Sequence, residues 1–182
     1  VWRHRDCGKQ PWLPAAAAAR HRGDYACERR AGLPPAGLLL GEPDGVKSER
    51  VSIISDMFVK SGLKAPISKD IRSDIWLKLI GNSSFNPLSV ITQNTLKEMC
   101  ENEDTRKIIE DMMREVIFIG EKLNIKMKLT IEKRIEGARN VGDHKTSTLQ
   151  DYENKRPLEL NALINSLIEL GELTDVETPT LN

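Results

Sequence analysis

Apolar and polar positions alternate with helical spacing over most of the chain after residue 68. The pattern is clearest in segment 103–123, where apolar residues recur three or four positions apart behind an acidic first turn, which the helix dipole favours. We expect one helix there, with Met112 and Met113 as core-filling side chains. Its inward face is predicted to consist of Ile108, Met112, Val116, Ile119 and Leu123.

Further helices are expected on either side of this segment. One begins near Ser68, and another begins at Pro157 and ends before Gly171, since proline suits the first turn of a helix. Segment 125–140 has a weaker helical pattern, and segment 141–151 is expected to be a polar loop. The apolar positions assigned to the flanking helices are Ile71, Ile75 and Leu79 in the first, and Leu160, Leu163, Leu167 and Leu170 in the second.

A short β-α-β pattern precedes these helices. Leu38–Leu40, followed by the turn residues 41–45, predicts a strand. Ser48 is placed to cap a helix that Gly62 closes, and residues 65–67 form a second extended piece. The predicted fold class is therefore mostly α, with one small β-α-β unit ahead of the helices.

The first 37 residues differ in composition from the remainder. Isoleucine is absent before Ile53 and occurs sixteen times from there on, whereas eight of the eleven alanines precede residue 37. We interpret residues 1–37 as an irregular segment. It is either a natural Pro/Ala-rich linker or a frame-shifted stretch, and its tryptophans, histidines and cysteines favour the second. The predicted organisation is 1–37, then 38–67, then a helical domain over 68–182.

Charge and composition exclude several function classes. The 27 basic and 27 acidic residues cancel, so no positive field favours a nucleic-acid partner. No apolar run approaches the roughly 20 residues that span a bilayer. The three cysteines form no C-x-x-C pair and the three histidines are scattered, so neither a disulfide framework nor a metal site is expected. We expect a soluble cytoplasmic protein without a membrane or nucleic-acid partner.

Three polar residues stand out on the helix that begins near Ser68. Lys78, Asn82 and Asn86 are each four positions apart, so they align on one face about 6 Å apart along the axis. Pro87 follows directly, and the helix is expected to bend or end there. Such a row of donors and acceptors suits a polar ligand. A solvated helix face with a terminal asparagine is the alternative reading.

Five motifs in order resemble the ketopantoate reductase family, also called 2-dehydropantoate 2-reductase. Two of them are Gly41-Glu42-Pro43-Asp44-Gly45 and the K-x-x-x-N-x-x-x-N spacing of the row just described, with Asp70-Ile71 and Trp76-Leu77 ahead of it. The other three are Thr146-Ser147-Thr148-Leu149-Gln150-Asp151, Arg156-Pro157-Leu158-Glu159-Leu160-Asn161, and Thr178-Pro179 with the residues after it. The resemblance extends from about Leu39 to the end of the chain.

The resemblance implies a fold. Residues 68–182 would form the helical C-terminal domain of the 6-phosphogluconate-dehydrogenase-like type, and residues 38–67 the end of a Rossmann domain. No G-x-G occurs among the twelve glycines, so the phosphate-binding loop of that domain is missing from this sequence. We therefore expect the chain to be a fragment that lacks most of the Rossmann domain at its N-terminal end and is truncated at its C-terminus. Such a fragment is expected to be inactive alone.

The resemblance also implies an activity. It is the NADPH-dependent reduction of 2-dehydropantoate (ketopantoate) to pantoate, an oxidoreductase step of pantothenate and coenzyme A biosynthesis. Lys78 would be the general acid. Asn82, Asn86, Ser147 and Glu159 would bind or orient the substrate, and the cofactor-binding residues stay unknown. The implied partners are a small 2-keto acid and a second copy in a homodimer.

Each of these roles has an ordinary alternative. Glu159 would also stabilise the first turn of a helix begun by Pro157, and Ser147 or Asp151 would also cap a short helix. His144 is read as a loop residue without a role. The family often has aspartate and glycine where Asn161 and Asn165 stand. Two other functions remain open, a related 2-keto acid reductase and a non-catalytic helical interaction fragment.

Overall fold

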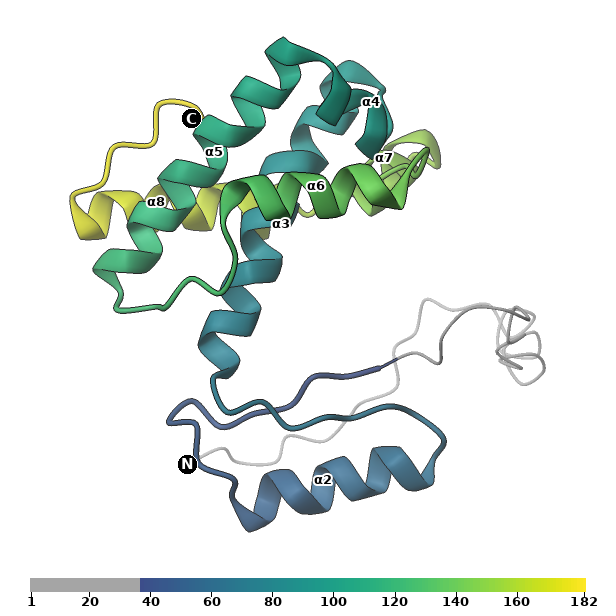
Figure 1. Cartoon of the computed structure of the whole chain (residues 1–182), viewed down its shortest axis with the longest axis vertical. Coiled ribbons are helices and arrows are strands. Elements are labelled where there is room, and N and C mark those ends of the chain that lie inside the picture. The colour runs from purple at the N-terminus through teal and green to yellow at the C-terminus, as the bar shows by residue number, and fades with distance from the viewer. Residues whose placement is uncertain (1–36) are drawn as a thin grey trace, which may run out of the picture. The chain divides into compact units, whose positions relative to one another are not determined.

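Helices dominate residues 37–182, the part of the chain that the computed structural model describes (Figure 1). The expected mostly helical fold class is confirmed, whereas the irregular segment expected over 1–37 lies, except for residue 37, outside the described residues. The elements are α2 (Glu49–Lys60), α3 (Ile71–Thr92), α4 (Leu96–Glu101), α5 (Glu103–Lys122), α6 (Ile131–Val141), α7 (Ser147–Glu153), the π-helical turn η1 (Asn161–Asn165) and α8 (Ser166–Thr174).

The expected β-α-β pattern surrounds α2. Parallel bridges join Gly37 to Lys64 and Leu40 to Ile67, so the chain on either side of α2 runs in the same direction. The predicted strand at Leu38–Leu40 is reduced to these isolated bridges. Ser48 caps α2 as predicted, its hydroxyl accepting a hydrogen bond from the amide of Val51 at 3.1 Å.

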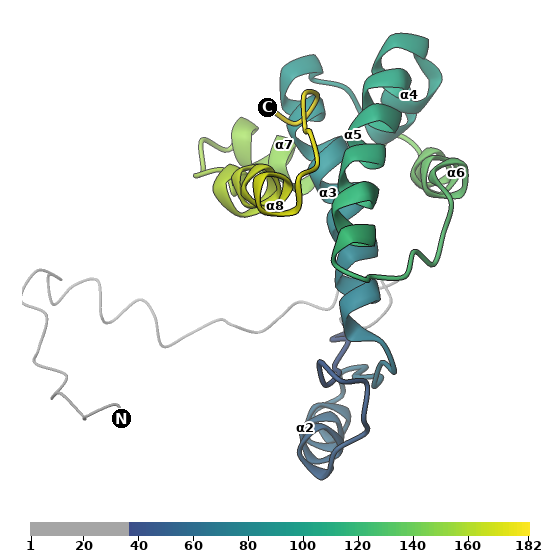
Figure 2. The same cartoon turned by 90° about the vertical axis from the view of Figure 1, so that its left-hand side faces the viewer.

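The long helices α3 and α5 form the centre of the helical domain. Figure 2 shows them side by side, with α8 and α6 on opposite sides of the pair. The Trp76 indole of α3 donates to the carbonyl of Val116 in α5 at 3.0 Å. A β-carbon at Gly120 would lie only 2.4 Å from the indole nitrogen, so glycine is required at this crossing. The prediction that Ile75 belongs to the inward face is wrong, because its side chain is 58% exposed.

Of the two outcomes expected at Pro87, a bend or an end, the end does not occur, because α3 continues to Thr92. Ser83 and Ser84 lie fully buried in its middle. Their hydroxyls donate to the carbonyls of Leu79 and Ile80, at 2.8 and 2.9 Å, so the helix satisfies their polarity internally. Such small side chains allow α5 and α7 to pack closely on α3.

Helix α5 has the predicted extent but a different inward face. Ile108 and Leu123 are 40% and 36% exposed, whereas Ile109 and Met113 are fully buried. Met112 and Met113 both lie in the core, as predicted. Helix α5 contacts α3, α4, α6 and α8, and its buried arc is therefore wider than a single stripe of apolar residues.

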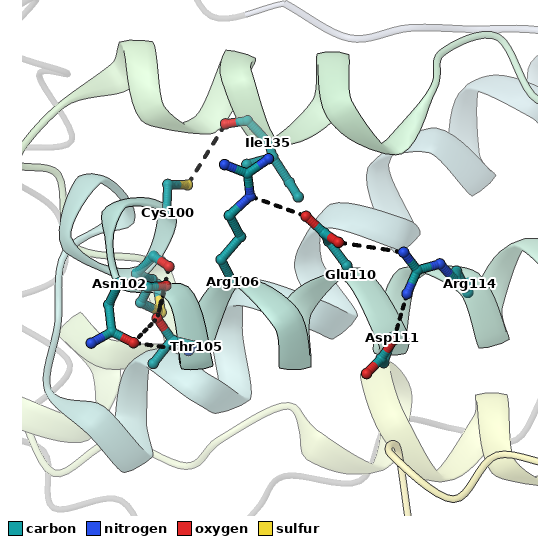
Figure 3. A network of polar contacts seen from close by, with 9 residues as sticks. Cys100, Asn102, Thr105, Arg106, Glu110, Asp111, Arg114 and Ile135 are labelled. Atoms are coloured by element: carbon teal, nitrogen blue, oxygen red, sulfur yellow. Dashed lines mark hydrogen bonds and ion pairs between the residues drawn. The ribbon is translucent and has the colours of Figure 1, made fainter.

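Helices α4, α5 and α6 are joined by the polar contacts drawn in Figure 3. The Asn102 side chain accepts from the amide of Thr105 at 3.0 Å and caps α5. The Cys100 thiol points to the carbonyl of Ile135 at 3.6 Å, which ties α4 to α6. A ladder of ion pairs runs along the exposed side of α5 through Arg106, Glu110, Arg114 and Asp111.

Three boundaries differ from the sequence prediction. Helix α6 begins at Ile131 rather than near residue 125. The predicted polar loop 141–151 contains most of α7. The last helix begins at Leu160 rather than Pro157, passes through η1 and runs beyond Gly171 to Thr174, leaving Leu160 39% exposed. None of the helices within 37–182 is both long enough and apolar enough to cross a bilayer.

Candidate substrate-binding site

Three of the five predicted site residues line one cavity, where α3, α4, α6 and the turn before α7 meet. Asn82 and Asn86 come from α3 and Ser147 from the start of α7. The cavity has a volume of about 360 Å³, which lies within the range of small-molecule sites. Two larger hollows, of about 500 and 460 Å³, contain none of the predicted residues.

Helix α3 aligns the two asparagines. Four positions separate Asn82 from Asn86, so both amides face the cavity one turn apart. Asn86 is 6% exposed and lies inside the helix, not at its end as the sequence suggested. Within residues 37–182 neither side-chain amide makes a hydrogen bond to another residue, although both amides border the cavity. Their donors and acceptors are therefore available to a ligand.

A chain of hydroxyl groups connects the asparagine helix to Ser147. The Thr146 hydroxyl caps α7 by accepting from the amide of Leu149 at 3.1 Å and lies 2.6 Å from the Ser89 hydroxyl. Ser89 gives its proton to the carbonyl of Asn86 at 2.7 Å, which leaves Thr146 as the donor to Ser89. Thr146, one residue before the predicted cap, therefore fixes the position of Ser147.

Two polar residues of the cavity were not considered as site residues from the sequence. Arg134 projects from α6, and Thr146 lies beside Ser147. A signal for Arg134 does exist, because Ile131, Ile135 and Ala138 mark the inward face of α6 and Arg134 falls within that stripe. Burial lowers the pKa of the Arg134 guanidinium.

His144 belongs to the loop between α6 and α7, as the sequence suggested, but it also borders the cavity. Its backbone carbonyl accepts from the amide of Leu96 at 3.0 Å. This bond holds the α6–α7 loop to the first turn of α4. His144 therefore lines the cavity and, through its backbone carbonyl, holds the loop in place.

Lys78 and Glu159 are not among the residues that line the cavity. Lys78 is exposed on α3, one turn before Asn82, so it stays in line with the two asparagines. Glu159 is exposed just ahead of the last helix, so it does not lie in the first turn of that helix as its alternative reading required. Nearby, the Asn165 amide donates to the Asn161 side chain at 2.8 Å, so the two departures from the family pattern contact each other across η1.

The described residues do not fit a dinucleotide. A pyrophosphate is normally held by a glycine-rich turn at the N-terminus of a helix. At the start of α2 that place is taken by the Glu42 carboxylate, which accepts hydrogen bonds from Ser48 and Arg50. These two hydrogen bonds lower the pKa of Glu42, with Arg50 the larger cause. A phosphate would meet a negative charge here, so the start of α2 does not provide the cofactor cradle.

Comparison with known proteins links the chain to relatives of one kind. A 2-dehydropantoate 2-reductase of Mesorhizobium japonicum is 49% identical over 143 residues, which is 79% of this chain and 44% of the relative. The structure of 2-dehydropantoate 2-reductase from Methylococcus capsulatus has a TM-score of 0.73 at 26% identity, covering 82% of this chain and 48% of that one. This chain therefore spans about half the length of the relatives it matches.

A further structure, D-mandelate dehydrogenase in complex with NADH, has a TM-score of 0.72. The match covers 82% of this chain and 52% of the D-mandelate dehydrogenase chain. At 21% identity, it shows a shared fold alone. The family model described as "Ketopantoate reductase PanE/ApbA C terminal" matches residues 70–182, well over half of the sequence. The matched range includes α6, α7 and the whole of α3 with its aligned lysine and asparagines. The chain belongs to the ketopantoate reductase family, and residues 70–182 are its C-terminal helical domain.

Proposed function

We propose that this chain carries the substrate-binding part of an NADPH-dependent 2-dehydropantoate 2-reductase, which forms pantoate in pantothenate and coenzyme A biosynthesis. The observation that carries the proposal is the pair of available amides, Asn82 and Asn86, in one cavity with Ser147 and in line with Lys78. The Mesorhizobium japonicum relative, a 2-dehydropantoate 2-reductase, supports the choice of substrate.

The chemistry requires a proton donor at the ketone. When a ketone becomes an alcohol, negative charge develops on its oxygen, and a cation that already points there stabilises the transition state. Lys78 is assigned this role, since an ammonium group carries three donors. Asn82 and Asn86 hold the substrate's hydroxyl and ketone oxygens, and Ser147 donates to its carboxylate. Glu159 is the proposed orienting group.

The hydride comes from a nicotinamide cofactor, NADPH by family resemblance. The start of α2 does not provide its cradle, so we expect a separate Rossmann domain to bind it, with residues 38–67 as the end of that domain. The exposed Lys78 would then face this domain. The homodimer and the cytoplasmic location are expectations of the same proposal. A reductase for another 2-keto acid is the second candidate, since Asn82, Asn86 and Ser147 would also hold the oxygens of a different 2-keto acid.

Binding of 2-dehydropantoate to the chain, measured by titration calorimetry, tests the proposal without requiring turnover. Asn82→Ala is expected to weaken binding about tenfold, because loss of one good hydrogen bond costs roughly 1–1.5 kcal/mol. Asn140→Ala, an exposed asparagine of α6, is the matched control and should leave binding unchanged. Lys78→Met should change binding less than Asn82→Ala, because its main interaction forms in the transition state. Equal losses for Asn82→Ala and Asn140→Ala would contradict the proposed site.

A further inference from the structure

The Arg134 side chain lies directly against the backbone of α3 at Gly81. A β-carbon built on Gly81 would be 2.0 Å from Nη2, 2.6 Å from Cζ and 2.8 Å from Nε of Arg134. The guanidinium group therefore occupies the space that any other residue at position 81 would fill. Glycine is unfavourable in a helix interior, and its presence here leaves room for Arg134 beside Asn82.

Arg134 is not neutralised within the described residues. Five of the seven arginines in 37–182 form ion pairs, and the two that do not are Arg134 and the exposed Arg72. No side-chain hydrogen bond joins Arg134 to another residue of this region either. A half-buried guanidinium stays charged, and withdrawing an unpaired charge from water is unfavourable. An anion in the cavity would supply the missing partner.

The cavity provides a matching set of groups around that charge. Asn82 and Asn86 lie on one wall and Ser147 on another, all with polar groups that a carboxylic acid can use. The planar guanidinium donates two parallel hydrogen bonds to a carboxylate, a geometry that neither a serine nor a lysine reproduces. The charge and the planar donor set both favour an anion with two oxygens that accept in parallel, and the carboxylate is the group of a 2-oxo acid that provides them.

We propose that Arg134 binds the carboxylate of the substrate and restricts this cavity to 2-oxo acid anions. The ketone then points along α3 toward Lys78, while Ser147 adds a third hydrogen bond to the carboxylate. The identity of the acid as 2-dehydropantoate rests on the proposed function, but the requirement for a carboxylate does not.

The test compares an acid with its uncharged ester. Binding of 2-dehydropantoate and of its methyl ester to the full chain is measured by titration calorimetry for the wild type and for Arg134→Met. The variant keeps an unbranched apolar stem but no charge, and it should weaken binding of the acid at least tenfold while changing that of the ester less than threefold. Arg139→Met, five positions further on the same helix and paired with Glu101 outside the cavity, should leave both affinities within twofold.

Gly81→Ala supplies an independent variant that keeps the arginine. Its methyl group displaces the far end of a flexible side chain, and alanine favours the helix, so the melting temperature should stay the same or rise. Binding of the acid should nevertheless weaken at least fivefold. In the Arg134→Met background Gly81→Ala should have no further effect, because the two changes then remove the same contact. An undiminished effect there would mean that the methyl group blocks the ligand directly and would count against the proposal.

The outcomes separate this inference from the proposed function. If 2-dehydropantoate binds equally well to the wild type and to a folded Arg134→Met variant, the inference is overturned and the proposed substrate stands. If 2-oxobutanoate binds in an Arg134-dependent way and 2-dehydropantoate does not, the inference stands and the proposed substrate is wrong. If no 2-oxo acid binds to the wild type, both are rejected. A melting temperature of Arg134→Met far below the wild-type value would reveal a structural role instead.

Discussion

At the scale of single residues, the site depends on buried hydroxyl groups. Ser89 is fully buried and Thr146 is 5% exposed, and together they connect the carbonyl of Asn86 to the amide of Leu149. Each hydroxyl both donates and accepts. The positions of Asn86 and Ser147 relative to each other therefore depend on the side chains of Ser89 and Thr146. Of these two, only Thr146 lines the cavity.

Ser89→Ala is expected to destabilise the chain by about 1–3 kcal/mol, because Thr146 loses its acceptor in a buried place. Amide exchange at Leu149 should accelerate, since the cap of α7 loosens. Urea unfolding followed by circular dichroism measures the first effect and hydrogen exchange the second. Ser61→Ala removes a similar bond at the surface, from its hydroxyl to the carbonyl of Met57 at 2.9 Å, and should cost less than about 0.5 kcal/mol. Similar costs for the two variants would contradict the proposed role of Ser89.

Residue-level prediction from the sequence was limited by the width of buried faces. Asn82 and Asn86 could be aligned from the sequence because helical spacing alone places them on one face, and Ser147 lines the same cavity. Ile108 and Ile109 both fit an apolar repeat, so the pattern alone does not show which of them is buried. The contacts of α5 with four other helices decide for Ile109. Arg134 was missed because an arginine within an apolar stripe is ordinarily a side chain whose charged end reaches water.

At the scale of elements, start signals were more informative than stop signals. The caps of α2 and the acidic start of α5 were readable because the capping residue lies next to the helix that it begins. The sequence offered α7 only as the alternative to a polar loop, a short helix capped by Ser147 or Asp151, because the segment is short and polar. A Thr146 cap with one fully buried residue, Leu149, stabilises it. Proline did not mark the helix ends, since α3 continues past Pro87, where a bend or an end was expected, and the last helix begins after Pro157.

The N-terminus of α3 is held by carboxylates whose state depends on pH. Asp70 caps the helix through the amide and hydroxyl of Ser73. Asp74 pairs with Lys128 at 2.5 Å and accepts from Ser68. These contacts, with Lys128 the larger cause, hold the pKa of Asp74 below its ordinary value. The segments before α3 and before α6 are thereby fastened to the first turn of α3.

Asp74→Asn should reduce the loss of stability in acid. A carboxyl group with a lowered folded pKa contributes stability above its unfolded value of about 3.9, and that contribution disappears as pH falls through the folded pKa. Between about pH 5 and pH 2 the variant should therefore show a flatter decline in unfolding free energy than the wild type, from a lower plateau at pH 7. Asp56→Asn, on the exposed side of α2 and unpaired within residues 37–182, is the control. Parallel acid limbs for Asp74→Asn and wild type would contradict this account.

At the scale of the whole described region, the large apolar core belongs to the helical domain and not to α2. The helical domain has a continuous core around Trp76, Ile109 and Val116. Helix α2 instead leaves Ile53, Met57 and Val59 between 53% and 64% exposed. Exposed apolar side chains gathered on one helix suggest a surface that another segment covers. This agrees with the prediction, still untested, that residues 38–67 belong to a larger Rossmann domain.

The C-terminal segment is joined to the centre of the helical domain by a single buried carboxylate. Glu115 of α5 is 8% exposed and accepts from the amides of Thr180 and Leu181 at 2.8 and 3.0 Å. Leu181 is 6% exposed and belongs to the core. One charged group thus satisfies two backbone donors and places an apolar anchor 66 positions away in sequence. Bonds to a charged acceptor are among the stronger hydrogen bonds of proteins.

Glu115→Gln is expected to destabilise the chain by about 1.5–3 kcal/mol, because a glutamine has one acceptor oxygen for two backbone donors and lacks the charge. Exchange of the Thr180 and Leu181 amides should accelerate together, while exchange in α6 should change little. Hydrogen exchange and urea unfolding measure both effects. Glu121→Gln, exposed on the same helix, should alter stability by less than about 0.5 kcal/mol. If neither the Thr180 nor the Leu181 amide exchanges faster than in Glu121→Gln, the carboxylate is not the joint anchor described above.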